Sequence, residues 1–202
     1  SSDLIRRGGV PGSPALTRGA AGASYVAVAL LVIQIALGAI TVKLELPAWT
    51  IILHLGTAML LLATLLIAAR AAPPMRAGRS RAGLAAAALG LVTVLLGALT
   101  ANTGAATACL GFPLCSGEWM PAGSPLQHIH WTHRIFAYAL FGYVVWWAAR
   151  TKARGAWSVV GPVALQVAVA AAMVLLGLPR ALQAAHVAAG AAVWAGRVLA
   201  AL

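Results

Sequence analysis

Long apolar stretches separated by short polar connections dominate the sequence. A helix needs ~20 apolar residues to cross a bilayer core of about 30 Å. Six segments meet or approach this length, at residues 25–42, 49–69, 82–101, 130–149, 157–178 and 182–202. These runs are too long, and alternate too little between apolar and polar residues, for the strands of a membrane β-barrel. The pattern therefore predicts an all-α integral membrane protein with six transmembrane helices paired as hairpins.

The composition indicates that lipid is the solvent of most of the chain. Hydrophobic residues make up 62% of the 202 residues and charged residues 8%, whereas soluble domains carry roughly 25% charged residues. The net charge is +11 because the chain has only three acids, Asp3, Glu45 and Glu118. The basic residues lie between the apolar runs, where membrane topology explains them, and this argues against nucleic acid as a partner.

The distribution of basic residues predicts which connections face the cytoplasm. Lysine and arginine accumulate on the cytoplasmic side of membrane proteins. With a cytoplasmic N-terminus, eleven of the 14 basic residues fall inside and only Lys43, Arg134 and Arg180 fall outside. We therefore expect an inner-membrane protein with both termini in the cytoplasm. Residues 1–23 lack the apolar core of a secretory signal and are expected to form a cytoplasmic N-terminal segment.

Both cysteines lie in the longest connection between apolar segments, residues 102–129. The predicted topology places this connection on the outer face of the membrane. An oxidising outer compartment permits a disulfide between Cys109 and Cys115. Two free thiols are the alternative, and a metal site built on this pair alone would be incomplete.

An internal repeat places a histidine near the outer end of three of the predicted helices. The two most similar copies are 132 positions apart and consist of a helix, a Leu-Pro turn and a second helix. Their markers are Gln34, Pro47 and His54 in one copy and Gln166, Pro179 and His186 in the other. A looser third copy has a longer outer connection, in which Gly97-Ala98-Leu99-Thr100 echoes Gly38-Ala39-Ile40-Thr41 and His133 opens the next helix.

Three histidines at one depth indicate a heme site. A histidine inside a membrane is costly and usually faces the bundle interior, and neutral imidazole is an axial ligand of heme iron. We therefore expect His54, His133 and His186 to ligate heme iron, with Arg134 and Arg180 pairing with the propionates. The alternatives are structural hydrogen bonding for each histidine and snorkelling to the headgroups for each arginine. Zinc would require more ligands and usually carboxylate or thiolate.

A specific stretch around the cysteines resembles the heme A synthase family of cytochrome oxidase assembly proteins. It comprises a Thr-Gly-Ala turn, a cysteine pair around Pro-Leu and a His-Arg pair at the start of a helix: Thr103-Gly104-Ala105, Ala108-Cys109, Phe112-Pro113-Leu114-Cys115, Pro121 and His130-Trp131-Thr132-His133-Arg134. The paired Gln, Leu-Pro and His markers resemble the other helix hairpins of that family. The resemblance extends from Tyr25 to the end of the chain.

This resemblance implies heme b, and heme O or heme A, as cofactors. Family members have two four-helix halves with a pair of axial histidines in each, so that His133 and His186 would ligate one heme and His54 would match a ligand of the other half. The cysteine pair would match an outer-loop disulfide. Only three of the family's four hairpins are present. The second ligand opposite His54 would then be His128, His130 or a residue of another subunit, and His130 stands where the family carries a catalytic Glu.

The expected organisation is a cytoplasmic segment at 1–23, a helical hairpin at 24–70 and a four-helix heme-binding bundle at 82–202. The resemblance implies oxidation of heme O to heme A for cytochrome oxidase assembly. The alternative is a non-catalytic subunit, binding heme b for electron transfer or purely structural, within a larger membrane respiratory or photosynthetic complex. Because a hairpin and the Glu are missing, the sequence leaves open whether the chain is an enzyme, and no catalytic residue is assigned.

Overall fold

The computed structural model describes residues 14–70, 81–151 and 156–201. Six α-helices follow one another along this part of the chain: α1 (Pro14–Lys43), α2 (Ala48–Arg70), α3 (Arg81–Asn102), α4 (Pro125–Thr151), α5 (Val160–Leu175) and α6 (Arg180–Ala201). Two short 3-10 helices, η1 (Ala105–Thr107) and η2 (Ala156–Val159), precede α4 and α5. The described residues contain no β-strand, only an isolated bridge between Cys115 and Glu118. The predicted all-α fold is confirmed.

Five of the six helices are long and apolar enough to span a membrane. The exception is α4, which has the length but also contains three histidines and Arg134 in its first half. These polar groups lower its mean hydropathy relative to the other helices. The assignment of α4 as a sixth span therefore stays a prediction, supported by its packing beside α3 and α5.

Two helices begin earlier than the hydropathy pattern predicted. Helix α1 begins at Pro14 and α4 at Pro125, whereas the apolar segments were predicted from residues 25 and 130. Proline suits the first position of a helix because its missing N–H would have had no partner there. Hydropathy marks the membrane-embedded part of a helix, so the predicted segments omitted these polar first turns.

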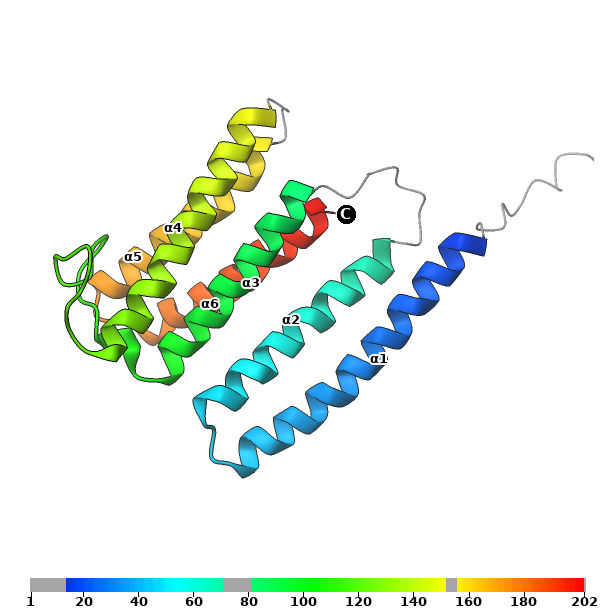
Figure 1. Cartoon of the computed structure of the whole chain (residues 1–202), viewed down its shortest axis with the longest axis horizontal. Coiled ribbons are helices and arrows are strands. Elements are labelled where there is room, and N and C mark those ends of the chain that lie inside the picture. Colours follow the sequence, from blue (N-terminus) through cyan, green and yellow to red (C-terminus); the bar gives the residue numbers. More distant parts are fainter. Residues whose placement is uncertain (1–13, 71–80, 152–155, 202) are drawn as a thin grey trace, which may run out of the picture.

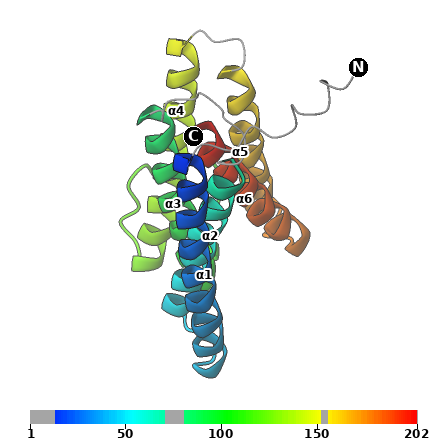
Figure 2. The same cartoon turned by 90° about the vertical axis from the view of Figure 1, so that its right-hand side faces the viewer.

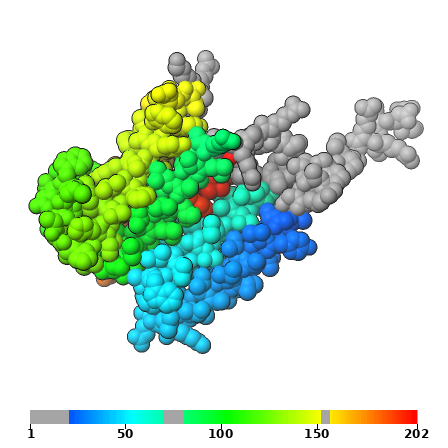
Figure 3. Space-filling model, viewed as in Figure 1, coloured from blue at the N-terminus to red at the C-terminus, as the bar shows by residue number. Residues whose placement is uncertain are grey.

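The helices form a hairpin set against a four-helix bundle (Figure 1). Helices α1 and α2 pack along each other, and α2 contacts both α3 and α6. Within the bundle, α3 packs against α4 and α6, and α5 packs against α4 and α6. Figure 2 shows α1 and α2 stacked beside the bundle rather than inserted into it. The space-filling view shows the hairpin along one flank of the molecule (Figure 3).

The interface between the hairpin and the bundle is apolar, and small residues allow α3 and α6 to approach closely beside it. Met59 of α2 forms a buried cluster with Trp194 and Val198 of α6. Trp194 also donates its indole N–H to the Ala87 carbonyl of α3 over 2.9 Å, which links α6 to α3. At the end of the same pair of helices, an added Cβ at Gly83 would lie 2.7 Å from the Cα of Ala201. Small residues let helices approach closely when no water is present to drive their association.

The two turns of the internal repeat have the same backbone hydrogen bonds. The N–H of Leu46 donates to the Thr41 carbonyl over 2.9 Å, and the N–H of Leu178 donates to the Met173 carbonyl over 2.8 Å. Both leucines adopt positive φ, 63° and 61°. This is the arrangement of a Schellman motif, in which a residue beyond the helix end bonds back across the last turn. The proline that follows each leucine directly precedes the next helix. Each Leu-Pro pair therefore marks the same kind of turn between two helices.

Candidate functional site

His133 projects from α4 against α3. Its Nδ1–H donates to the backbone carbonyl of Thr93 over 3.1 Å. That carbonyl belongs to helix α3, one turn before Gly97. A Cβ added to Gly97 would lie 3.0 Å from Cε1 of His133, tighter than most Cβ contacts in proteins. The glycine therefore makes room for the imidazole, and the carbonyl fixes which ring nitrogen carries the proton.

His186 of α6 is held by Gln166 of α5. The amide Nε2 of Gln166 donates to Nδ1 of His186 over 3.0 Å and to the His186 carbonyl over 2.8 Å. Gly190, one turn further along α6, lies so close that an added Cβ would be 3.1 Å from the same Nε2. The Oε1 atom of Gln166 is buried without a hydrogen-bond partner.

The bundle brings His133 and His186 into one region. His133 lies on α4 and His186 on α6, and both helices pack against α3 and α5. Among the described residues, no three or more of the side chains of His, Cys, Asp and Glu cluster where a metal ion could bind. A bare metal ion such as zinc requires such a set. Axial ligation of heme needs only two imidazoles.

The protonation pattern of His133 fits heme iron. Because Nδ1–H is bonded to a carbonyl, Nε2 keeps its lone pair available, the usual arrangement for a ligating histidine. In His186, Nδ1 instead accepts a hydrogen bond from the Gln166 amide, so the proton of the neutral ring lies on Nε2 and would have to leave that atom before iron could bind there.

His54 of α2 is bonded differently. Its Nε2 accepts a hydrogen bond from Nε2 of Gln34 on α1 over 2.9 Å, and its Nδ1 is buried without a partner. Gly38 faces the ring, with an added Cβ 3.2 Å from Cε1 of His54. The hairpin thus repeats the set of glutamine, glycine and histidine, but the nitrogen that would bind iron is occupied by the glutamine.

The other two histidines of α4 lie at its start. His130 is buried, and its Nδ1–H donates to the Ala105 carbonyl of η1 over 3.0 Å. His128 is exposed and bonds to the Ser124 carbonyl over 3.1 Å. The described contacts of both residues therefore lie within the α3–α4 connection, and the opposite ligand for His54 stays a prediction.

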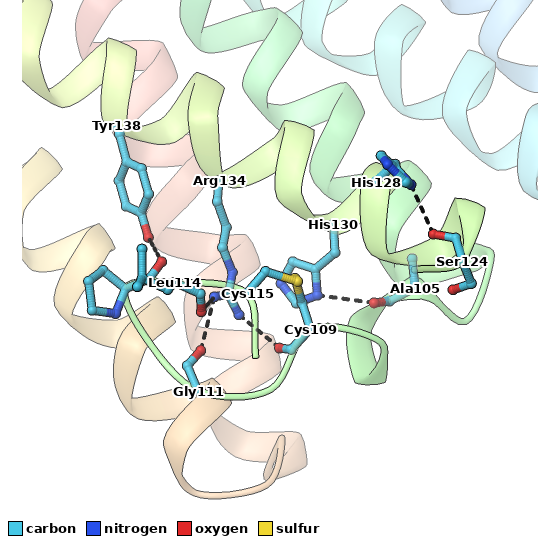
Figure 4. The surroundings of a disulfide bond; sticks show 11 residues. Ala105, Cys109, Gly111, Leu114, Cys115, Ser124, His128, His130, Arg134 and Tyr138 are labelled. Carbon is cyan, nitrogen blue, oxygen red and sulfur yellow. Dashed lines mark hydrogen bonds between the residues drawn. A yellow bond between two sulfur atoms is a disulfide. The ribbon is translucent and has the colours of Figure 1, made fainter. Parts of the chain in front are cut away.

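Arg134 has a role that the sequence did not indicate. Its guanidinium is buried and donates to three carbonyls of the connection between α3 and α4 (Figure 4). The hydrogen bonds reach Gly111 at 2.9 Å, Leu114 at 2.7 Å and Cys109 at 2.9 Å. We call residues 103–124 the Cys loop. Arg134 anchors the Cys loop to α4, whereas Arg180 is exposed at the start of α6.

The Cys loop is closed by the predicted disulfide, which is confirmed. Cys109 and Cys115 are bonded, with Cα atoms 4.7 Å apart and no exposed surface on either residue. Tyr138, one turn beyond Arg134, donates its hydroxyl to the Pro113 carbonyl over 2.7 Å. The ring of Trp131 packs edge-on against Tyr138, with 6.5 Å between centroids. One face of α4 therefore binds the Cys loop through side chains spaced about one turn apart.

Sequence reasoning missed the backbone partners of the site. It did not find the Thr93 carbonyl behind His133 or the loop carbonyls around Arg134, because any residue type can supply a carbonyl. A signal for the glycines was present. Gly38 and Gly97 occupy the same position in two copies of the repeat, and both turn out to face a histidine ring.

Comparison with known proteins adds one match. A family model described as "Cytochrome oxidase assembly protein" matches residues 13–198, which is most of the chain. No curated protein matches the sequence.

Proposed function

Because the chain belongs to the heme A synthase family of cytochrome oxidase assembly proteins, we propose that its α3–α6 bundle binds heme O between His133 and His186 and takes part in its conversion to heme A. The observation that carries this proposal is the Nδ1–H hydrogen bond from His133 to the Thr93 carbonyl, which leaves Nε2 available to iron. When heme is bound, its iron together with an oxidant would supply the redox chemistry. The chain supplies ligation and orientation.

Each residue of the proposed site has a physical task. The Thr93 carbonyl accepts from the His133 ring, as outer hydrogen-bond partners of ligating histidines do, and the Gln166 amide holds the His186 ring. Gly97 keeps the space beside His133 open. Arg180 is the guanidinium proposed to pair with a propionate, since it is exposed at the same end of the bundle. Arg134 is engaged by the Cys loop, so we give it the task of holding that loop over the site.

A second function is favoured by His130. By resemblance this position carries a catalytic Glu in the family, whereas His130 here is buried and donates to the Ala105 carbonyl. A residue fixed in this way offers no carboxylate for proton transfer. The alternative is therefore a heme b protein that passes electrons, or supports other membrane subunits, during assembly of the oxidase. We further propose inner-membrane location with both termini in the cytoplasm and the Cys loop outside.

The two functions differ in the heme that the protein carries. The protein should be purified from cells that make heme O and analysed by pyridine hemochrome spectrum and by mass of the extracted heme. Heme O or heme A supports the synthase, and heme b alone supports the electron-transfer alternative. His133→Ala and His186→Ala should each abolish the band of the bound heme, whereas His128→Ala, at an exposed position, should leave it intact. Unchanged spectra in both site variants would overturn the proposed ligation.

A further inference from the structure

A groove between α5 and α6 has a buried arginine in its lining. Its volume is about 280 Å³, and its lining includes Pro162 and Leu165 of α5 and Ala189, Ala192, Gly196 and Arg197 of α6. The small α6 residues recur at helical spacing, so the surface along one side of the helix is recessed. The groove has many times the volume of one water molecule, about 30 Å³, and can take a stretch of hydrocarbon chain.

Arg197 is the unusual member of this lining. Its side chain is only 5% exposed, and its Nε atom is buried without a hydrogen-bond partner. An arginine near a helix end normally extends its guanidinium to the membrane surface. A buried guanidinium is costly unless its N–H groups find acceptors, as those of Arg134 do in the Cys loop. The Nε–H of Arg197 has no acceptor in the described chain, and an anion is the strongest acceptor that could serve it.

The described part of the chain provides no such charge near Arg197. Its acids are Glu45, in the α1–α2 turn, and Glu118, in the Cys loop. The α1–α2 turn, the Cys loop and the α5–α6 turn lie at one end of the helices (Figure 1). Arg197 lies in the last turns of α6 (Arg180–Ala201), far from the α5–α6 turn. The anion must then come from outside the described chain.

We propose that this groove binds an anionic phospholipid, with its phosphate on Arg197 and an acyl chain along α5 and α6. Guanidinium and phosphate form charge-assisted hydrogen bonds, and the small apolar residues accept the chain. The orientation of this site along the helices fits a lipid in a bilayer. Arg197 and Pro162 lie toward the ends of the helices, where a headgroup would lie, and Leu165 and Ala189 lie further in. This site is separate from the histidine site and does not depend on the proposed function.

Native mass spectrometry of the detergent-solubilised full chain can test the site. The protein is titrated with phosphatidylglycerol and with phosphatidylcholine of the same acyl chains. Both lipids offer a phosphate, but phosphatidylglycerol carries a net negative charge and phosphatidylcholine carries none. We expect phosphatidylglycerol to bind about tenfold more tightly, and Arg197→Gln to remove this preference, because a buried guanidinium favours a partner with net opposite charge. Arg180→Gln, an exposed arginine at the opposite end of α6, is the matched control and should keep the preference.

A second variant guards against misfolding of the Arg197 variant. Gly196 lines the groove, and an added Cβ there meets no atom within 4 Å, so Gly196→Leu fills the groove without disturbing the fold. Gly142→Leu makes the same change at another open position, on α4. We expect Gly196→Leu to weaken phosphatidylglycerol binding and Gly142→Leu to leave it unchanged. Equal binding of both lipids, unaltered binding in both groove variants, or displacement of the lipid by inorganic phosphate alone would overturn the proposal.

Discussion

Replacing Arg134 with alanine should release the Cys loop from α4 while leaving the helices folded. The guanidinium donates to the carbonyls of Cys109, Gly111 and Leu114. Alanine removes all three hydrogen bonds and the charge. The disulfide would remain, so the loop would stay closed on itself but lose its attachment at the start of α4.

The magnitude follows from how far water can replace the lost donor. Gly111 is exposed, so its carbonyl can bond to water, whereas Leu114 is half-buried and Cys109 is fully buried. A hydrogen bond to a charged group is worth ~1.5–3 kcal/mol, and a buried acceptor left unpaired costs about 1–3 kcal/mol. Counting the Cys109 carbonyl in full and that of Leu114 in part gives about 3 kcal/mol of local stability. This corresponds to a roughly hundredfold larger population of the open loop.

Reduction of the disulfide reports this opening, because neither cysteine has exposed surface and a reductant must wait for the loop to open. The chain has two cysteines, so a gel shift with a polyethylene glycol maleimide after timed exposure to a phosphine gives the rate directly. When opening and closing are fast, this rate tracks the open population. We expect Arg134→Ala to be reduced roughly a hundredfold faster than the wild type.

Two further variants make this measurement decisive. Arg134→Lys keeps a positive charge but lacks the fork that reaches several carbonyls at once, so its rate should fall between wild type and alanine. Arg180→Ala removes an exposed arginine and should leave the rate unchanged. Equal reduction rates in wild type and Arg134→Ala, with both helical circular dichroism spectra intact, would refute the reasoning that Arg134 holds the loop.

The remaining predictions concern packing within the bundle. Gly97→Ala places a Cβ 3.0 Å from Cε1 of His133. Overpacking of this kind costs roughly 1–3 kcal/mol, so a heme titration should show about tenfold weaker binding. Heme binding equal to that of the control Gly142→Ala, where the added Cβ meets open space, would contradict this prediction. Trp194→Phe removes an indole hydrogen bond to α3, which is worth about 1 kcal/mol, and should lower the Tm by roughly 2–4 °C. If the Tm falls no further than it does in Trp146→Phe, at an exposed position, the result would count against that hydrogen bond.

The sequence predicted the helical part of this fold well, for identifiable reasons. Hydropathy marked five of the helices because a segment buried in lipid is apolar over most of its length, and it marked α4 through the apolar second half of that helix. The 132-residue repeat predicted equivalent hairpins, and the Leu46 and Leu178 turns have equivalent hydrogen bonds. The Cys109–Cys115 disulfide was also predictable, because the predicted topology places both cysteines of the chain in one connection on the oxidising outer face.

Only the tertiary structure decided how the polar groups meet. The sequence marked His133 and Arg134 as candidates, but not that one bonds to α3 and the other to the Cys loop. A helix that is apolar on all sides carries little information about its rotation. That rotation is set by close packing of small residues such as Gly97 against a facing side chain. Whether a residue such as His133 or Arg134 faces the bundle or the Cys loop therefore depends on the rotation of the helix, which hydropathy does not encode.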